Sequence, residues 1–172
     1  MKLDHSNPKI AVFGGGRWAR VLLSVLIANT KPDVKFSVHT KNLEEDMRRW
    51  IDKSNFTNRV CVTNTDPDFS RSQYMAAIVV NSLSDHKRSA EMAISAKIPV
   101  LVEKPMATSF DDTFALVESA KKNETLITPS WVFLYASYID NFTNHLGNIN
   151  KIKTIHFNWT DKFSETRYGE IK

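Results

Sequence analysis

The chain alternates between short apolar runs and longer segments in which apolar residues recur every three or four positions, and this alternation constrains the fold more than any other feature. Residues 10–13 and 75–80 are uninterrupted apolar runs, which indicate strands buried on both faces. Residues 17–29 carry apolar side chains at helical spacing. Buried strands separated by helices form a parallel sheet covered by helices on both sides. The sequence therefore predicts an α/β fold, a doubly wound parallel sheet.

The predicted elements follow a βαβαβ-βαβαβ order along the chain. Strands are predicted at residues 9–13, 34–38, 59–63, 75–80, 99–102 and 125–128. Helices are predicted between them, and three of these are expected to be capped by Asn42, by Ser84 or Asp85, and by Ser109. Cys61 is expected to be a buried thiol in the third strand.

The last part of the chain has a different pattern. Residues 131–145 predict a helix that Gly147 ends, and residues 151–159 alternate, with Ile155, Phe157 and Trp159 on one side. A lone strand is not stable, because its backbone groups need partners, so this strand requires another chain or further residues. We expect a doubly wound domain over 1–128 and, over 129–172, a crossover helix and the first strand of a second, α+β domain.

Composition and charge exclude several classes of protein. The 172 residues are 42% hydrophobic and 24% charged, which is typical of a soluble globular protein, and no run approaches the roughly 18 apolar residues of a membrane span. The net charge of +4 is spread along the chain without a nucleic-acid-binding motif. One cysteine and no apolar signal core favour the cytoplasm, and the histidines show no metal-ligand spacing. We therefore expect no nucleic acid, membrane or metal partner.

A glycine-rich segment joins the first predicted strand to the first predicted helix. Gly14 to Ala19 form a G-x-G-x-x-A run in the position of a dinucleotide-binding fingerprint. Gly14 permits a tight turn, Gly16 allows the backbone to approach a pyrophosphate, and Ala19 allows the helix to pack closely on the strand. The helix N-terminus then offers free N–H groups to the phosphates. The alternative is a glycine-rich turn without a ligand.

The end of the second predicted strand bears on which cofactor binds. NAD-binding domains place an acid there to hold the ribose hydroxyls, but this chain has Thr40 and Lys41. A hydroxyl followed by a lysine can hold a 2′-phosphate through a charge-assisted bond. The sequence therefore favours NADP, with NAD as the alternative. Lys41 could equally be a solvated surface lysine.

Polar residues also follow the fourth and fifth predicted strands. Asn81 and His86 follow the fourth, and Glu103, Lys104 and Pro105 follow the fifth. Doubly wound folds bind ligands at the carboxyl ends of their strands. A lysine in a dry cleft can act in proton transfer, and a cis Pro105 would aim Lys104 into that cleft. The alternatives are a structural ion pair of Glu103 and a solvent-facing His86.

With these residues in place, the chain resembles the Gfo/Idh/MocA family of NAD(P)-dependent oxidoreductases over almost its whole length. Residues 98–105 closely resemble the family's E-K-P signature, and residues 131–135 resemble its crossover segment into a second domain. After the fourth strand the family has T-P-N-x-x-H, of which this chain keeps only the histidine, with Leu83 in the position of the Asn.

The resemblance implies a role for each motif residue. It places Gly14, Gly16, Arg17 and Trp18 on the pyrophosphate and adenosine side, Thr40 and Lys41 at the ribose, and Asn81, Leu83, His86 and Glu103 around the nicotinamide half. Lys104 would be the catalytic residue at the substrate hydroxyl or carbonyl. Family members continue into an open antiparallel sheet that supplies substrate contacts and an oligomer interface, so a homo-oligomer through the C-terminal strand is expected.

Two functions from different classes remain. The first is an NAD(P)-dependent oxidoreductase that transfers a hydride between a nicotinamide and a secondary alcohol or ketone of a sugar or sugar derivative. The second is a non-catalytic dinucleotide-binding module, either regulatory or truncated. The Glu103-Lys104-Pro105 run favours the enzyme, and the short length favours the module.

Overall fold

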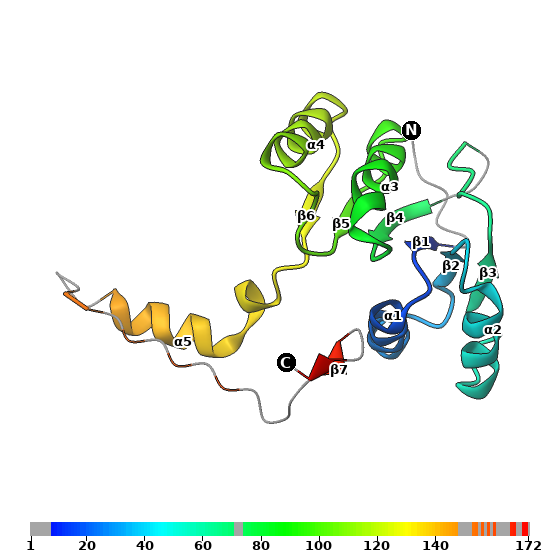
Figure 1. The fold of residues 1–172 in the computed structure, drawn as a ribbon, viewed down its shortest axis with the longest axis horizontal. Coiled ribbons are helices and arrows are strands. Elements are labelled where there is room, and N and C mark those ends of the chain that lie inside the picture. Colours follow the sequence, from blue (N-terminus) through cyan, green and yellow to red (C-terminus); the bar gives the residue numbers. More distant parts are fainter. Residues whose placement is uncertain are drawn as a thin grey trace. The chain divides into compact units, whose positions relative to one another are not determined.

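A computed structural model describes residues 8–70 and 74–147, together with residues 153, 154, 156, 158, 160, 166, 167, 170 and 171 (Figure 1). The chain divides into two compact units, Met1–Trp131 and Val132–Lys172. The first unit holds the sheet and the candidate site. The boundary at residue 128, and a second domain over 129–172, stay predictions.

The first unit is built on a six-stranded parallel sheet, in the strand order β3-β2-β1-β4-β5-β6. Every pairing between neighbouring strands is parallel, which confirms the doubly wound prediction. The order reverses between β1 and β4, so a crevice is expected at the carboxyl ends of these two strands. The strands are β1 (Lys9–Phe13), β2 (Lys35–His39), β3 (Val60–Thr63), β4 (Tyr74–Val79), β5 (Val100–Val102) and β6 (Ile127–Pro129).

Two apolar cores lie on opposite faces of this sheet. In β1, Ala11 and Phe13 belong to one core and Ile10 and Val12 to the other, because successive strand residues point to opposite faces. The first core is covered by α3 (Leu83–Ser95) and α4 (Phe110–Lys122), and the second by α1 (Arg17–Asn29) and α2 (Glu44–Lys53). Figure 1 shows these four helices around the sheet.

Helix starts differ in part from the sequence prediction. Ser109 caps α4 as predicted, since its Oγ accepts from the backbone N–H of Asp112. The Asn42 prediction is wrong: α2 begins at Glu44 after Leu43, and no side chain caps it. The prediction of Ser84 or Asp85 is also wrong, because α3 begins at Leu83 after Ser82. Cap preference alone cannot choose among adjacent polar residues when the strand before them fixes where the chain turns.

Cys61 was expected in the core, but it is exposed. Its strand, β3, lies at the edge of the sheet, next to β2 alone. Alternate residues of an edge strand need not be covered by helices, so its pattern of burial is Val60 and Val62 inside and Cys61 outside. The prediction that Cys61 is buried is therefore wrong, because it took every residue of the strand to be covered.

The second unit holds short elements. The helix predicted over 131–145 is interrupted: Val132–Tyr135 form the 3₁₀ helix η1, and α5 runs over Ser137–Leu146, ending before Gly147. Two two-residue strands, β7 (Thr166–Arg167) and β8 (Glu170–Ile171), pair antiparallel. The strand predicted over 151–159 is wrong at 153, 154, 156 and 158, which lie in no helix or strand. Ile155, Phe157 and Trp159 lie outside the described residues, so the homo-oligomer stays a prediction.

Candidate dinucleotide-binding site

The glycine loop sits at the carboxyl end of β1, held by the strands on either side. The backbone N–H of Gly14 donates to the carbonyl of His39 at 2.9 Å, and Gly14 has φ of +122°. A β-carbon on Gly14 would stand 2.7 Å from the carbonyl oxygen of Val80, and one on Gly15 would stand 2.9 Å from Thr40 Oγ1. These two glycines are therefore required by the packing of the loop itself.

Gly16 differs from the other two, because no described residue apart from its chain neighbours lies within 4 Å of where its β-carbon would be. It is the residue before α1, and no side chain caps that helix and no acid lies in its first turn. The first N–H groups of a helix lack intrahelical partners and carry partial positive charge. The loop thus leaves an open, positively polarised approach at Gly16, which fits a phosphate group.

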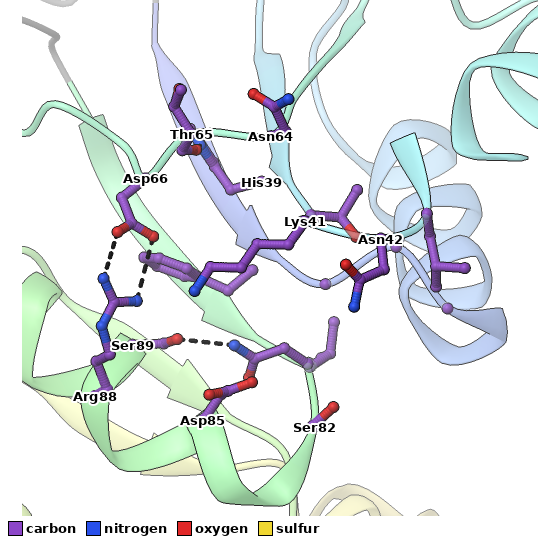
Figure 2. Close-up of a pocket in the computed structure, with 18 residues that line it drawn as sticks. His39, Lys41, Asn42, Asn64, Thr65, Asp66, Ser82, Asp85, Arg88 and Ser89 are labelled. Carbon is purple, nitrogen blue, oxygen red and sulfur yellow. Dashed lines mark hydrogen bonds and ion pairs between the residues drawn. The ribbon is translucent and has the colours of Figure 1, made fainter. Parts of the chain in front are cut away.

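A pocket of about 340 Å³ opens beside this loop (Figure 2). Its walls are the glycine loop, the residues at the carboxyl ends of β2, β3 and β4, and the first turns of α3. It therefore straddles the β1–β4 boundary, where the strand order reverses and where doubly wound folds bind ligands. The lining residues outside the loop include Thr40, Lys41, Asn42, Asn64, Thr65, Asp66, Asn81, Ser82, Asp85, Arg88 and Ser89.

His39 lines the pocket as a buried, fully hydrogen-bonded side chain. Its Nδ1 lies 2.7 Å from the carbonyl oxygen of Thr65, so Nδ1 is the donor, and its Nε2 lies 2.9 Å from Ser37 Oγ. Burial lowers the pKa of His39 below 6.5, and the nearby Lys9 charge lowers it further, whereas the bond to Thr65 opposes them. The neutral imidazole with Nδ1 protonated satisfies both contacts, with Ser37 donating to Nε2.

Charged side chains meet on the other side of the pocket. Arg88 of α3 forms an ion pair with Asp66, which follows β3. The bond from Arg88 is the main cause that lowers the pKa of Asp66, and the positive charge of Lys41 lowers it further. Figure 2 shows the Lys41 side chain extending across the pocket toward this pair. Lys41 itself forms no ion pair with any described residue.

Asn81 follows β4 and is tied to α3. Its Nδ2 donates to Ser89 Oγ at 2.8 Å. Its Oδ1 is buried and has no hydrogen-bond partner among the described residues. An unpaired buried acceptor costs free energy, and this one belongs to a residue of the pocket wall.

Glu103 follows β5 and is held by two donors. The indole Nε1 of Trp18 donates to Glu103 Oε2 at 2.8 Å, and the hydroxyl of Ser130 donates to the same oxygen at 2.5 Å. The sequence left open that Glu103 forms a structural ion pair with a nearby base. Among the described residues its partners are instead the neutral donors Trp18 and Ser130.

Lys104 and His86 occupy opposite environments. Lys104 is exposed rather than in a dry cleft, and its bond to Pro105 is cis. His86 is only 3% exposed, so the solvent-facing alternative is wrong. Its Nδ1 lies 2.9 Å from the carbonyl oxygen of Pro105, and its Nε2 lies 3.2 Å from that of Asn81. His86 thus joins the loops after β4 and β5.

The structure brings some of the sequence-predicted site residues together and not others. Gly14, Gly16, Thr40, Lys41 and Asn81 line the pocket. Outside its walls lie Arg17, Trp18, Ala19, Leu83, His86, Glu103 and Lys104. Among these, Ala19 lies on the buried face of α1, where its small side chain allows the helix to pack closely on the sheet. Arg17 lies in a separate hollow between α1 and α2.

Sequence reasoning missed Asp66, Arg88 and Ser89. A usable signal existed for Asp66: it follows a strand parallel to β2, so it must emerge at the same edge of the sheet. No group of three or more His, Cys, Asp or Glu in the described part of the chain could hold a metal ion. The same residues contain no helix long and apolar enough to cross a membrane.

A glycine loop, an uncapped helix N-terminus and a pocket at the switch point together define a nucleotide-binding Rossmann domain. Residues 8–130 match the model of the oxidoreductase family with an NAD-binding Rossmann fold, GFO_IDH_MocA, and the chain belongs to this family. The resemblance noted from the E-K-P segment is confirmed.

Individual relatives extend this comparison. The chain is 28% identical over 156 residues to the glucose-6-phosphate 3-dehydrogenase of Bacillus subtilis (strain 168), covering 87% of this chain and 42% of that protein. Its fold resembles GenD2 from gentamicin A biosynthesis in complex with NAD, with a TM-score of 0.69, 22% identity and coverage of 88% and 42%.

It also resembles KijD10, a 3-ketoreductase from Actinomadura kijaniata in complex with TDP-benzene and NADP, with a TM-score of 0.67, 20% identity and coverage of 82% and 43%. The chain thus spans less than half the length of these relatives.

Proposed function

We propose that the pocket at the β1–β4 boundary binds NADP, with NAD as the alternative, and that the protein transfers a hydride between this cofactor and a secondary alcohol or ketone of a sugar or sugar derivative. The single observation that carries the proposal is the open approach at Gly16. Gly14 and Gly15 are needed for packing, whereas Gly16 leaves room for a ligand beside free helical N–H groups.

The residues around the pocket fit the parts of the cofactor. Gly16 and the first turn of α1 would receive the pyrophosphate, and Thr40 and Lys41 would meet the adenosine ribose. Lys41 forms no ion pair with a described residue, so its ammonium can bind a 2′-phosphate, and no acid of β2 competes for it. This supports NADP. A hydroxyl or amide of the ligand would also supply the donor that no described residue offers to the buried Asn81 Oδ1.

The nicotinamide half would extend past the switch point toward the carboxyl ends of β4 and β5. Glu103 would face it there, together with Asn81 and the start of α3 at Leu83 and His86. A bound nicotinamide supplies hydride acceptance or donation at a substrate carbon. Lys104, exposed at the end of β5, would take the proton of the substrate hydroxyl in the oxidation or return it in the reduction.

The sugar class of the substrate is supported by what the relatives act on. One is named a glucose-6-phosphate 3-dehydrogenase, and another is a 3-ketoreductase that was crystallised with TDP-benzene. Both names describe redox chemistry at a carbon that carries a hydroxyl or a keto group, which agrees with the proton transfer proposed for Lys104.

The experiment has two stages. The 172-residue chain is titrated with NADPH and with NADH, and nicotinamide fluorescence reports binding; turnover is then assayed with glucose 6-phosphate and NADP⁺ or NAD⁺. Lys104→Ala should abolish turnover and leave cofactor affinity within about twofold, and Lys122→Ala, an exposed lysine of α4, is the matched control. Binding without turnover by the unmodified chain would favour the non-catalytic module, and no binding would contradict the proposal.

A further inference from the structure

One carboxylate oxygen joins three segments that are distant in sequence. Glu103 Oε2 accepts from Trp18, in the first turn of α1, and from Ser130, the residue after β6. Ser130 is itself fixed, because its backbone N–H donates to the carbonyl of Val102 at 2.9 Å. The bond between Trp18 and Glu103 spans 85 positions in the chain. It links the β1–α1 half of the doubly wound sheet to the β5–β6 half.

The bond between Trp18 and Glu103 connects the start of α1 to the ends of β4 and β5. Trp18 stands two residues after Gly16, at the helix terminus that opens toward the pocket. Glu103 stands at the end of β5, and its backbone N–H donates to the carbonyl of Val79 at the end of β4. A direct bond between these two side chains therefore sets the spacing between the phosphate-binding end of α1 and the strand ends of the second half.

Burial does not account for this arrangement. The Trp18 side chain is 44% exposed, so it contributes little to either apolar core. The indole N–H is the only hydrogen-bond donor of the Trp18 side chain, and it donates to Glu103. Both donors on Glu103 reach Oε2, and Oε1 accepts no hydrogen bond from a described residue. Oε2 is thus anchored by two donors, and Oε1 is bonded to no described residue.

We infer that Trp18 is a positioning residue for Glu103: it holds this carboxylate at a fixed distance from the phosphate loop, so that one dinucleotide can contact both. Trp18 acts through Glu103 rather than by donating to the cofactor. The inference rests on the proposed function, since it assigns Glu103 Oε1 to a hydroxyl of the nicotinamide riboside.

Trp18→Phe tests this, because it removes the N–H and keeps an aromatic ring. Calorimetric titration of the 172-residue chain would compare NADPH with 2′-phosphoadenosine 5′-diphosphate, which retains the adenosine and both phosphates but lacks the nicotinamide riboside. NADH and ADP are measured in parallel. The variant should bind the whole cofactor about tenfold more weakly, the lower end of the range for one hydrogen bond to a charged group, and the truncated ligand within about twofold of the unmodified chain.

Two further variants complete the test. Trp50→Phe makes the same chemical change on α2, where Trp50 packs edge-on against Phe56, and should leave both affinities unchanged. Ser130→Ala removes the second donor from Glu103 without touching α1, and should produce a smaller loss with the same selectivity. It also keeps the inference testable if Trp18→Phe fails to fold.

The outcomes separate the inference from the proposed function. Selective loss of the whole cofactor supports a positioning role. Unchanged affinities in Trp18→Phe and Ser130→Ala, or equal loss of both ligands, would overturn that role while the proposed function stands. If the unmodified chain binds neither the cofactors nor the truncated ligands, the proposed function fails, and the inference fails with it.

Discussion

A β-carbon on Gly14 would stand 2.7 Å from the carbonyl oxygen of Val80, so the turn after β1 is packed against the backbone at the end of β4. These two strands are neighbours in the sheet although they are separated by β2 and β3 in the chain. The contact brings the glycine loop to the point where the strand order reverses. The pocket proposed to bind the cofactor has one of its walls there.

Gly14→Ala should therefore destabilise the protein. Gly14 has φ of +122°, which a residue with a β-carbon rarely adopts, and the new methyl group would clash with the main chain of Val80. We expect a loss of about 1–3 kcal/mol in the free energy of unfolding, measured by urea denaturation. Gly16→Ala is the matched control, because beyond its chain neighbours no residue in the described part of the chain lies within 4 Å of the new β-carbon, and its stability should stay within about 0.5 kcal/mol. Equal stability of both variants would contradict this account of the loop.

Lys41→Asp should change the cofactor preference from NADP toward NAD. The substitution removes the cation expected at the 2′-phosphate and introduces an acid that can accept from ribose hydroxyls. NADPH affinity should fall by about 10-fold to 100-fold, the range for a hydrogen bond to a charged group, and NADH affinity should hold or rise.

Fluorescence titration of both cofactors measures the effect of this change. Lys31→Asp, which makes the same charge change at an exposed residue before β2, is the control and should leave the ratio of affinities unchanged. An unaltered NADPH-to-NADH ratio in Lys41→Asp would remove Lys41 from cofactor recognition.

Because His39 is buried, the free energy of unfolding should decrease as the pH falls into the mildly acidic range. Burial lowers the pKa of His39 below 6.5, so the unfolded chain binds a proton more readily than the folded one does. Stability therefore falls as the pH drops below about 6.5, and it stops falling below the folded pKa. His39→Gln should flatten this dependence between pH 7.5 and 5.5 in thermal unfolding, and His145→Gln, on α5, should not. A dependence equally steep in His39→Gln and the unmodified chain would show that other groups cause it.

The ion pair of Asp66 and Arg88 should stabilise the fold weakly and only above acidic pH. Arg88 lowers the pKa of Asp66 below 3.8, so the pair contributes fully above that pH and is lost as the pH falls through the folded value. Both side chains are partly exposed, and we expect a coupling energy of about 0.5 kcal/mol from a double-mutant cycle with Asp66→Asn and Arg88→Gln at pH 7. High salt should reduce it, and a coupling energy that high salt leaves unchanged would contradict the assignment.

Local patterns predicted the fold and the glycine loop because both depend on neighbours in sequence. The apolar runs at 10–13 and 75–80 are buried strands because helices cover both faces, and that coverage is visible as helical spacing between the runs. Gly14 and Gly16 were assigned different tasks from the fingerprint alone. The structure shows a tight fit at Gly14 and an open approach at Gly16.

Contacts that depend on strand order were not predictable in the same way. Asp66 meets Arg88 only because β3 lies two places from β1 and the loop after it reaches the far side of the pocket. The bond from Trp18 to Glu103 likewise requires α1 and β5 to lie at the same sheet edge. The predicted helix starts were wrong for a related reason. Asn42 was predicted to cap α2, but it lines the pocket instead.

The most direct measurement is the affinity of NADPH and NADH for the unmodified 172-residue chain and for Gly16→Ala, from nicotinamide fluorescence. The added methyl group occupies the open approach beside the first turn of α1, which the phosphates need. We predict that the unmodified chain binds at least one cofactor and that Gly16→Ala, with unchanged thermal stability, binds it at least about tenfold more weakly. Equal binding by the two proteins, or none by the unmodified chain, would contradict a phosphate-binding role for the glycine loop.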